Sequence, residues 1–504
     1  MKRTLFILTA LFGLLLSSSP ALAYDCEVDG IYYNLNKTDK TASVVSNYYG
    51  AYSGNIIIPV TIAYNNTTYS VTSIGAVAFS GCSGLTSVTI GNSVTSIGDC
   101  AFDNCSGLTS VTIGNSVKSI GQSAFAYCSG LTSVTIGNSV KSIGDCAFDN
   151  CSGLTSVTIG NSVTSIGDWA FDNCSGLTSV TIGNSVTTIG EEVFGNCPRL
   201  NSVIVDKNNG TYDSRDNCNA IIKTSTNKLI VGCKNTTIPN YVTSIGESAF
   251  YGCSGLTSAI IGNSVKSIGE SAFDSCSGLT SVTIGNSVTS IGQEAFCGCS
   301  GLTSVTIPNA VISIGYGAFS DCSGLTSVTI GNSVTSIGEG AFSYCSGLKS
   351  ATIPNSVTSI GGDVFRCCSG LTSFTIPNSV TSIGPCAFFC CSGLTKLVSL
   401  AVEPPTCGYY VFEEVDKTTC RLFVPKGSGN KYMRANQWNQ FMYISVYDGV
   451  DDVSVDTMDA IYEVYNLQGV RVGSGMREAE VTTDALPHGV YILVSPQGRK
   501  KLKI

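Results

Sequence analysis

One pattern of apolar and polar positions fills most of the chain and repeats every 23 residues. In the copy that begins at Cys82, the apolar positions are Leu85, Val88, Ile90, Val94, Ile97, Ala101 and Phe102. The cysteine that marks each copy recurs at Cys82, Cys105, Cys128, Cys151, Cys174, Cys197, Cys253, Cys276, Cys299, Cys322, Cys345, Cys368 and Cys391. One copy is too small to bury its own apolar face, so a fixed period of this length predicts a solenoid of stacked coils.

The order of residues within a copy predicts the path of one coil. Val88 and Ile90 alternate with Ser87 and Thr89, which is typical of a short strand with one buried face. Gly91 and Asn92 then favour a turn, residues 94–98 a second short strand, and residues 101–102 a tight or helical turn. We therefore expect a mainly β fold with parallel β-sheet and coils of 23 residues.

The repeat also matches a known template. Leu85-x-x-Val88-x-Ile90 fits the strand segment of a leucine-rich repeat, although Asn92 lies one residue before the position at which that template has its Asn. The longer pattern L-x-x-V-T-I-G-N-S-V-T-S-I-G-x-x-A-F-x-x-C, with proline for the first glycine in later copies, resembles the BspA-like leucine-rich repeat family of bacterial surface proteins. This resemblance covers residues 71–400. It implies a right-handed leucine-rich-repeat solenoid in a secreted or cell-surface protein, with adhesion to host matrix or other cells as the usual role.

Composition divides the chain into segments. Lys2-Arg3, an apolar run and Ala21-Leu22-Ala23 predict a secretory signal peptide. The expected segments are a signal peptide at 1–23, an N-terminal β cap at 24–70, the solenoid at 71–400 with an irregular insertion at 201–241, and a C-terminal cap at 401–445. No other stretch is long enough to cross a bilayer, so we expect no transmembrane span after signal removal. The predicted location is secreted or on the bacterial outer cell surface.

The last segment, residues 446–504, has the composition of a small β-sandwich module. Residues 465–469 and 486–491 give it a resemblance to the C-terminal sorting domain of Bacteroidetes-type bacteria, which implies outer-membrane export and surface attachment. A terminal β module without a sorting role is the alternative. In the C-terminal cap, residues 432–441 predict a short helix that covers the end of the stack.

The insertion allows two interpretations. Residues 220–223 and 228–231 predict a hairpin, with Cys218 and Cys233 at symmetric positions about its centre. The insertion is either a modified coil that keeps the stack in phase, which we favour, or a protruding contact loop.

The 24 cysteines of an exported chain suggest disulfides. Equivalent cysteines on successive coils would stand about 5 Å apart, a distance that a bridge allows. Side chains stacked in parallel rarely offer the required torsion, however, and free cysteine packs as a small hydrophobe, so a buried ladder is the favoured interpretation. Cys218 with Cys233 and Cys407 with Cys420 are further candidate pairs.

Composition also bears on chemistry. The formal net charge is −8 and the repeats carry no clustered basic face, which argues against nucleic acid as a partner. His488 is the sole histidine, so the repeats hold neither a catalytic triad nor a zinc site with histidine. We predict no enzyme, no catalytic residue, no cofactor and no metal. The recurring carboxylates of the turns, such as Asp99, Asp103 and Asp149, are interpreted as a solvated edge, with loose calcium binding as the alternative.

The outward positions of the first strand are the candidate binding face. These are Ser87, Thr89, Ser110, Thr112, Ser133, Thr135, Ser156, Thr158, Ser179, Thr181, Ser281, Thr283, Ser304, Thr306, Ser327 and Thr329. Stacking should align them in ladders of hydroxyls on a flat sheet roughly 60 Å long, at about 5 Å per coil. Such a surface makes many weak contacts whose effects add through avidity.

We therefore predict a protein that mediates adhesion or protein–protein interaction through its extended Ser/Thr-rich β face. The expected partner is an extracellular protein or a cell-surface ligand, such as a host matrix protein. The alternatives are a glycan-capturing surface protein and a structural spacer without a specific ligand, in which the hydroxyls serve only β-propensity and solubility. Ice binding by the regular threonine array is a more remote hypothesis.

Overall fold

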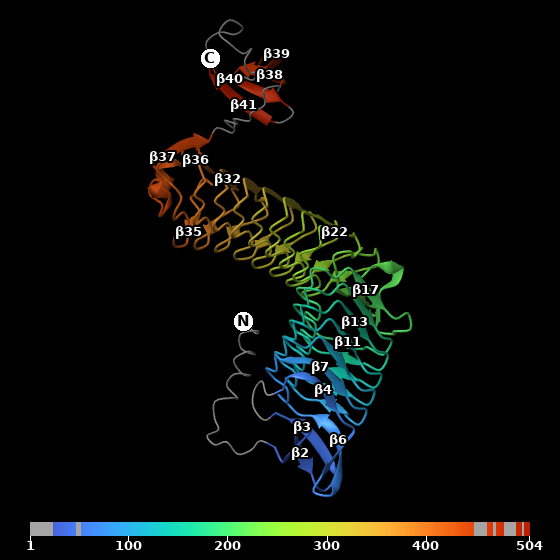
Figure 1. Ribbon diagram of the computed structural model, residues 1–504. Helices are drawn as coiled ribbons and strands as arrows, with labels where there is room; N and C mark the ends of the chain where they lie inside the picture. Colours follow the sequence, from blue (N-terminus) through green and yellow to red (C-terminus); the bar gives the residue numbers. More distant parts are fainter. Residues whose placement is uncertain are drawn as a thin grey trace.

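The computed structural model describes residues 24–46, 52–447, 461–466, 470–477, 490–495 and 498–503. The expected signal segment 1–23 and His488 lie outside the described residues. The repeats form a parallel β-solenoid, which confirms the predicted fold class (Figure 1). Each coil contains two short strands and a turn, and the next coil stacks on it in register.

The first strands of successive coils pair in parallel in four runs along the stack, as Val88 does with Val111. These strands are β7 (Leu85–Ile90), β9 (Ser110–Thr112), β11 (Ser133–Thr135), β13 (Ser156–Ile159), β15 (Ser179–Ile182), β17 (Ser202–Val205), β22 (Ser258–Ile261), β24 (Ser281–Ile284), β26 (Ser304–Ile307), β28 (Ser327–Ile330), β30 (Ser350–Thr352), β32 (Ser373–Ile376), β34 (Lys396–Ser399), β36 (Arg421–Pro425) and β37 (Tyr443–Tyr447).

The second strand is only two residues long, and it forms the other parallel sheets of the solenoid. These strands are β8 (Ser96–Ile97), β10 (Ser119–Ile120), β12 (Ser142–Ile143), β14 (Ser165–Ile166), β16 (Thr188–Ile189), β21 (Ser244–Ile245), β23 (Ser267–Ile268), β25 (Ser290–Ile291), β27 (Ser313–Ile314), β29 (Ser336–Ile337), β31 (Ser359–Ile360), β33 (Ser382–Ile383) and β35 (Thr406–Cys407).

A tight turn closes each coil and joins it to the next by three backbone hydrogen bonds. In one coil these run from the amides of Cys100, Phe102 and Asn104 to carbonyls of the following coil, at 2.7 to 2.8 Å. Cys100 and Asn104 have φ values of 52° and 57°. The position of Asn104 is occupied by Asn in several coils, because Asn adopts this left-handed backbone more readily than most residues.

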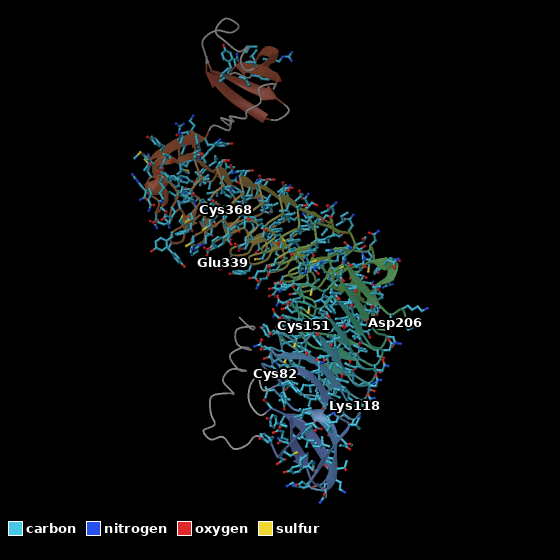
Figure 2. The ribbon with its side chains drawn as sticks, in the orientation of Figure 1. Cys82, Lys118, Cys151, Asp206, Glu339 and Cys368 are labelled. Carbon is cyan, nitrogen blue, oxygen red and sulfur yellow. The ribbon has the colours of Figure 1, made fainter. Side chains whose placement is uncertain are left out.

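The turn directs a phenylalanine and the repeat cysteine into the core. Phe79, Phe102, Phe125, Phe148 and Phe171 are fully buried and form a continuous stack, with ring centroids 4.8 to 5.1 Å apart. The expected coil spacing of about 5 Å is therefore confirmed. Figure 2 marks Cys82, Cys151 and Cys368 along the length of the stack.

The insertion folds as β18 (Tyr212–Asp213), the 3-10 helix η1 (Arg215–Asn217), β19 (Ile221–Lys223) and β20 (Lys228–Val231). The predicted hairpin is confirmed, since β19 and β20 pair in antiparallel fashion. β20 also pairs in parallel with β21, with Leu229 opposite Ile245, so the hairpin continues the second-strand sheet. This arrangement favours the modified coil over the protruding loop.

The hairpin separates two hydrophobic cores. Ile221 and Val231 belong to the core of the preceding coils, whereas Ile222 and Leu229 belong to that of the following coils. Because side chains alternate between the two faces of a strand, one hairpin serves as a wall for both cores. The stack changes direction here (Figure 1). We call residues 198–252 the junction.

Other strands cover the ends of the solenoid. The N-terminal strands are β1 (Cys26–Val28), β2 (Ile31–Asn36), β3 (Thr41–Val45), β4 (Gly54–Ile58), β5 (Thr61–Tyr64) and β6 (Thr67–Ile74). At the other end the expected helix over 432–441 is wrong in extent: the structure has α2 (Gly429–Tyr432) and the 3-10 helix η2 (Trp438–Gln440). Gln437 between them has a φ of 65°, which interrupts the helix.

Within its described residues, the C-terminal segment has four strands in one antiparallel sheet. They are β38 (Ile461–Asn466), β39 (Arg471–Arg477), β40 (Val490–Ser495) and β41 (Gly498–Lys503). No helix within the described ranges is long and apolar enough to cross a membrane.

Candidate functional site

The sixteen predicted face residues lie together on the outer side of the first-strand sheets. All are exposed except Ser87, Ser179 and Thr181, which are half-buried. The register places equivalent residues side by side on successive coils, as for Ser110 and Ser133. The alternation of Ser and Thr with Val and Ile therefore did place these side chains outward.

The hydroxyls of this face differ in their hydrogen bonding from those of the threonine that directly precedes the outward serine in each coil. Thr109, Thr178 and Thr280 each donate a hydrogen bond of 2.9 to 3.0 Å to the backbone carbonyl of the equivalent threonine one coil earlier. Of the sixteen face residues, only Ser87 makes a side-chain hydrogen bond within the described part of the chain, to Asn55. The other fifteen hydroxyls keep their donors and acceptors available to solvent or to a partner.

The face is not the single flat sheet that the repeat pattern predicts. β17 ends one sheet and β22 begins another, so the face is divided at the junction. Residues 235–238 repeat the first-strand pattern but do not form a strand, and the amide of Thr237 bonds to the carbonyl of Cys218 instead. The N-terminal block therefore carries ten of the predicted residues (Ser87 to Thr181), and the C-terminal block carries six (Ser281 to Thr329).

Isoleucines flank this division on the outer face, and the sequence interpretation missed them. Ile204 pairs with Thr181 and Ile260 with Thr283, so both occupy the outward threonine position. Their exposed fractions are 51% and 71%. The departure from threonine at a fixed repeat position is the signal that could have identified them.

The acidic edge of the turns is only partly solvated. Asp172 is fully buried and Asp149 nearly so, which contradicts the interpretation of a solvated edge at these positions. The amide of Asn173 bonds to Asp172 at 2.9 Å, and Asn196 donates to the same carboxylate at 3.2 Å. These folded-back amides replace water, so burial of the carboxylates is tolerated.

Burial also changes the acidity of two other turn carboxylates. It raises the pKa of Asp103 and of Asp274 to about 6, in each case mainly through loss of solvent. In the portion of the chain that is described, no group of three or more His, Cys, Asp or Glu side chains could hold a metal ion.

The repeat cysteines are packed inward, as the ladder interpretation predicts. Cys105, Cys151 and Cys276 donate S–H hydrogen bonds of 3.0 to 3.2 Å to phenylalanine carbonyls of earlier coils. Burial raises the pKa of Cys174 and Cys276 well above the ordinary thiol value, so these thiols remain protonated and unreactive. Within the described ranges no two cysteines are joined, including the candidate pairs Cys218 with Cys233 and Cys407 with Cys420.

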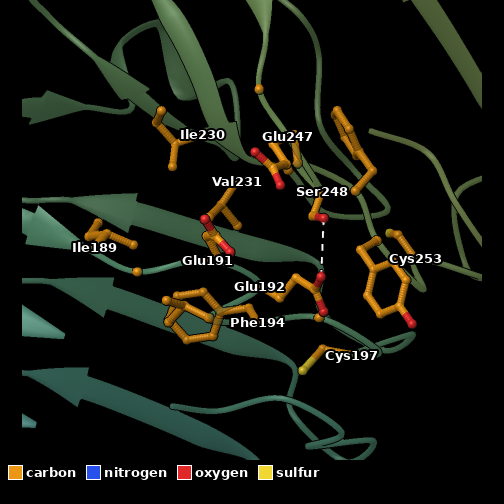
Figure 3. Close-up of a pocket in the computed structure, with 18 of the residues that line it drawn as sticks. Ile189, Glu191, Glu192, Phe194, Cys197, Ile230, Val231, Glu247, Ser248 and Cys253 are labelled. Carbon is orange, nitrogen blue, oxygen red and sulfur yellow. Dashed lines mark hydrogen bonds between the residues drawn. The ribbon is translucent and has the colours of Figure 1, made fainter. Parts of the chain in front are cut away.

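A pocket of about 380 Å³ lies at the junction (Figure 3). Ile189, Phe194 and Ile230 lie on one side of it, whereas Glu192, Glu247 and Ser248 lie on the other. Sequence reasoning did not find this pocket, because its walls come from segments that the insertion brings together.

The pocket forms because the regular stacking stops there. Three backbone hydrogen bonds join the turns of consecutive coils elsewhere. Across the junction the described structure keeps only one of them, from the amide of Asn196 to the carbonyl of Tyr251 at 3.1 Å. The carbonyl of Ala249, which would accept from Phe194, accepts instead from Gly232 at 2.7 Å. The strand β20 thus enters the space in which a regular coil would continue.

Comparisons with known proteins agree with this architecture. A model of the BspA type leucine rich repeat region (6 copies) matches residues 61–137, 119–226, 220–349 and 318–421. A search of the curated proteins finds none that matches this chain.

Solved structures include similar solenoids. A leucine-rich repeat protein from Bacteroides ovatus is 30% identical with a TM-score of 0.54, and the match covers 75% of this chain and 94% of that one. One from Eubacterium ventriosum is 25% identical with a TM-score of 0.56, covering 72% and 93%. The pneumococcal vaccine antigen PcpA shares the fold at 18% identity and a TM-score of 0.51, covering 84% and 98%. With its repeats matched over more than half of its length, the chain belongs to the BspA-type leucine-rich repeat proteins.

Proposed function

We propose that this protein is an exported surface protein that binds an extracellular protein or cell-surface ligand through the outer face of its first strands, and so mediates adhesion. The observation that carries this proposal is the set of fifteen face hydroxyls without a partner in the described structure, set beside the internally bonded threonines of the next position. Leucine-rich repeat solenoids generally serve as scaffolds for protein binding, and their extended sheets form the contact surface.

The form of the face favours a protein partner of large area over a small ligand. Equivalent hydroxyls recur on successive coils, so many weak contacts form at once and add through avidity. Glycan capture is the alternative function, and a structural spacer that binds nothing is the other. The outer face carries exposed isoleucines at Ile204 and Ile260 but none of the sixteen face residues is aromatic, which favours protein over tight sugar binding.

Charge insertion on the face tests the proposal. Ser133→Lys and Ser156→Lys place ammonium groups on two successive coils, and the fold accepts lysine there because Lys396 occupies the equivalent position opposite Ser373. Thr164→Lys is the matched control on the second-strand side, where Lys118 and Lys141 occupy equivalent positions on the two preceding coils.

The readout is adhesion of cells or beads that carry the mature chain to surfaces coated with extracellular matrix proteins. We expect the double Ser→Lys variant to reduce adhesion at least tenfold through loss of avidity, and Thr164→Lys to leave it unchanged. Equal adhesion by the wild type and both variants would refute the role of this face. A glycan array in parallel identifies sugar capture, and a spacer binds to neither surface.

A further inference from the structure

The junction pocket has walls of two kinds. Phe194, Ile230 and Val231 supply apolar surface, and Phe250 closes the side of the following coils. The phenylalanine stack that fills the core elsewhere has no ring contact between Phe194 and Phe250, although it resumes between Phe250 and Phe273 at 4.7 Å. The strand β20 enters between these two coils, and Gly232 lies directly against the ring of Phe250.

The charge of the lining is strongly negative. Four carboxylates, Asp168, Glu191, Glu192 and Glu247, line the pocket, and Lys228 is its single basic residue. The carboxylate of Glu192 is held in place at both oxygens, by the indole of Trp169 at 3.2 Å and by the hydroxyl of Ser248 at 3.2 Å. A fixed carboxylate beside an apolar wall matches a cation that is carried on an aliphatic stem.

We propose that this pocket binds an amine or guanidinium group on an aliphatic stem. The stem lies against Phe194 and Ile230, and the cation faces Glu192 and Glu247. The volume of about 380 Å³ accommodates such a group in extended form. Two sources carry this chemistry, namely a free polyamine-type molecule and the lysine or arginine side chain of a protein partner. The inference stands apart from the adhesive function, because the pocket and the outer face share no residue.

Calorimetric titration of the folded mature chain tests the proposal. One probe is agmatine, a four-carbon chain with a guanidinium at one end and an ammonium at the other; the second is the blocked peptide acetyl-Ala-Arg-Ala-amide; and the neutral control is N-butylacetamide. We expect at least one cationic probe to bind and the neutral probe not to bind. Binding should also change the fluorescence of Trp169, whose indole contacts Glu192.

Variants then locate the site. Glu192→Gln with Glu247→Gln removes two charges at nearly constant size and should weaken cation binding by up to about thirtyfold, since each such pair contributes up to about 1 kcal/mol. Glu270→Gln is the matched control, because Glu270 occupies the position of Glu247 one coil further on and does not line the pocket. Ile230→Lys supplies an internal ammonium group to the pocket and should abolish binding of the probe.

Tighter binding of the peptide identifies a protein partner, and tighter binding of agmatine identifies a free amine. The inference is overturned if neither cation binds at millimolar concentration, or if Glu270→Gln weakens binding as much as the double variant. Far-ultraviolet circular dichroism of each variant confirms that the solenoid is intact. A positive titration together with unchanged adhesion of the Ser→Lys variants would support the pocket and refute the adhesive face.

Discussion

Replacement of Phe148 by alanine should destabilise the solenoid severely and locally. Phe148 is fully buried, and its ring stacks on those of Phe125 and Phe171 with centroids 5.1 Å away on both sides. Truncation of a buried phenylalanine costs about 3–5 kcal/mol through lost transfer free energy and the cavity left behind. The two lost ring contacts account for about 1–3 kcal/mol of that free energy. Phe148→Leu, which keeps a branched apolar side chain, should therefore cost about 1–3 kcal/mol.

Urea unfolding followed by circular dichroism measures this loss of stability, and hydrogen exchange locates it. Each coil contacts only its neighbours, so faster exchange should be confined to the coils around Phe148 and should leave the coils after the junction unchanged. Thr158→Ala, on the exposed face of the next coil, is the control and should alter stability by no more than about 0.5 kcal/mol. An unchanged unfolding midpoint for Phe148→Ala, or exchange that rises equally beyond Phe250, would refute the argument that stacking of adjacent coils holds the fold.

Three further perturbations test other features. Gly232→Ala should lower the melting temperature, since the added Cβ would lie 2.0 Å from a ring carbon of Phe250 and overpacking costs about 1–3 kcal/mol, whereas Gly160→Ala, with no atom within 4 Å, should not. Asp103 and Asp274 have folded-state pKa values of about 6, above the ordinary carboxyl value, so their contribution is fully present below about pH 4 and is lost as pH rises through 6. Melting temperature should accordingly rise from pH 7 to pH 5, and Asp103→Asn with Asp274→Asn should flatten this change; an identical pH profile would contradict the cause given. The repeat cysteines should resist a thiol reagent in the native protein and react in urea, and complete labelling without denaturant would disprove their burial.

The repeat itself made most of the fold predictable. Each copy supplies the same alternation, so the inward position of Val88 and the outward position of Thr89 follow from two residues of local sequence. Stacking at a fixed period then determines the neighbours of each residue without knowledge of long-range contacts. The ladder of buried cysteines and the outward hydroxyls could be inferred for the same reason.

Features that depend on contacts outside the period were not predictable. Asp149 and Asp172 share their spacing with exposed carboxylates, and their burial depends on asparagine amides that fold back over them. Residues 235–238 repeat the strand pattern, but the carbonyl of Cys218 takes the bond that a strand would need. The junction pocket depends on Gly232 entering beside Phe250, which only the folded insertion brings about.

The hairpin wall at the junction also bears on how such a chain changes length. Because Ile221 and Ile222 point into different cores, neither core depends on the number of coils in the other. Duplication or deletion of one 23-residue unit on either side would lengthen or shorten that side by one layer and leave the angle between the two sides unaltered. Near-identical copies favour such events during replication, so this architecture allows the length of each stack to change while the bend between the two stacks stays constant.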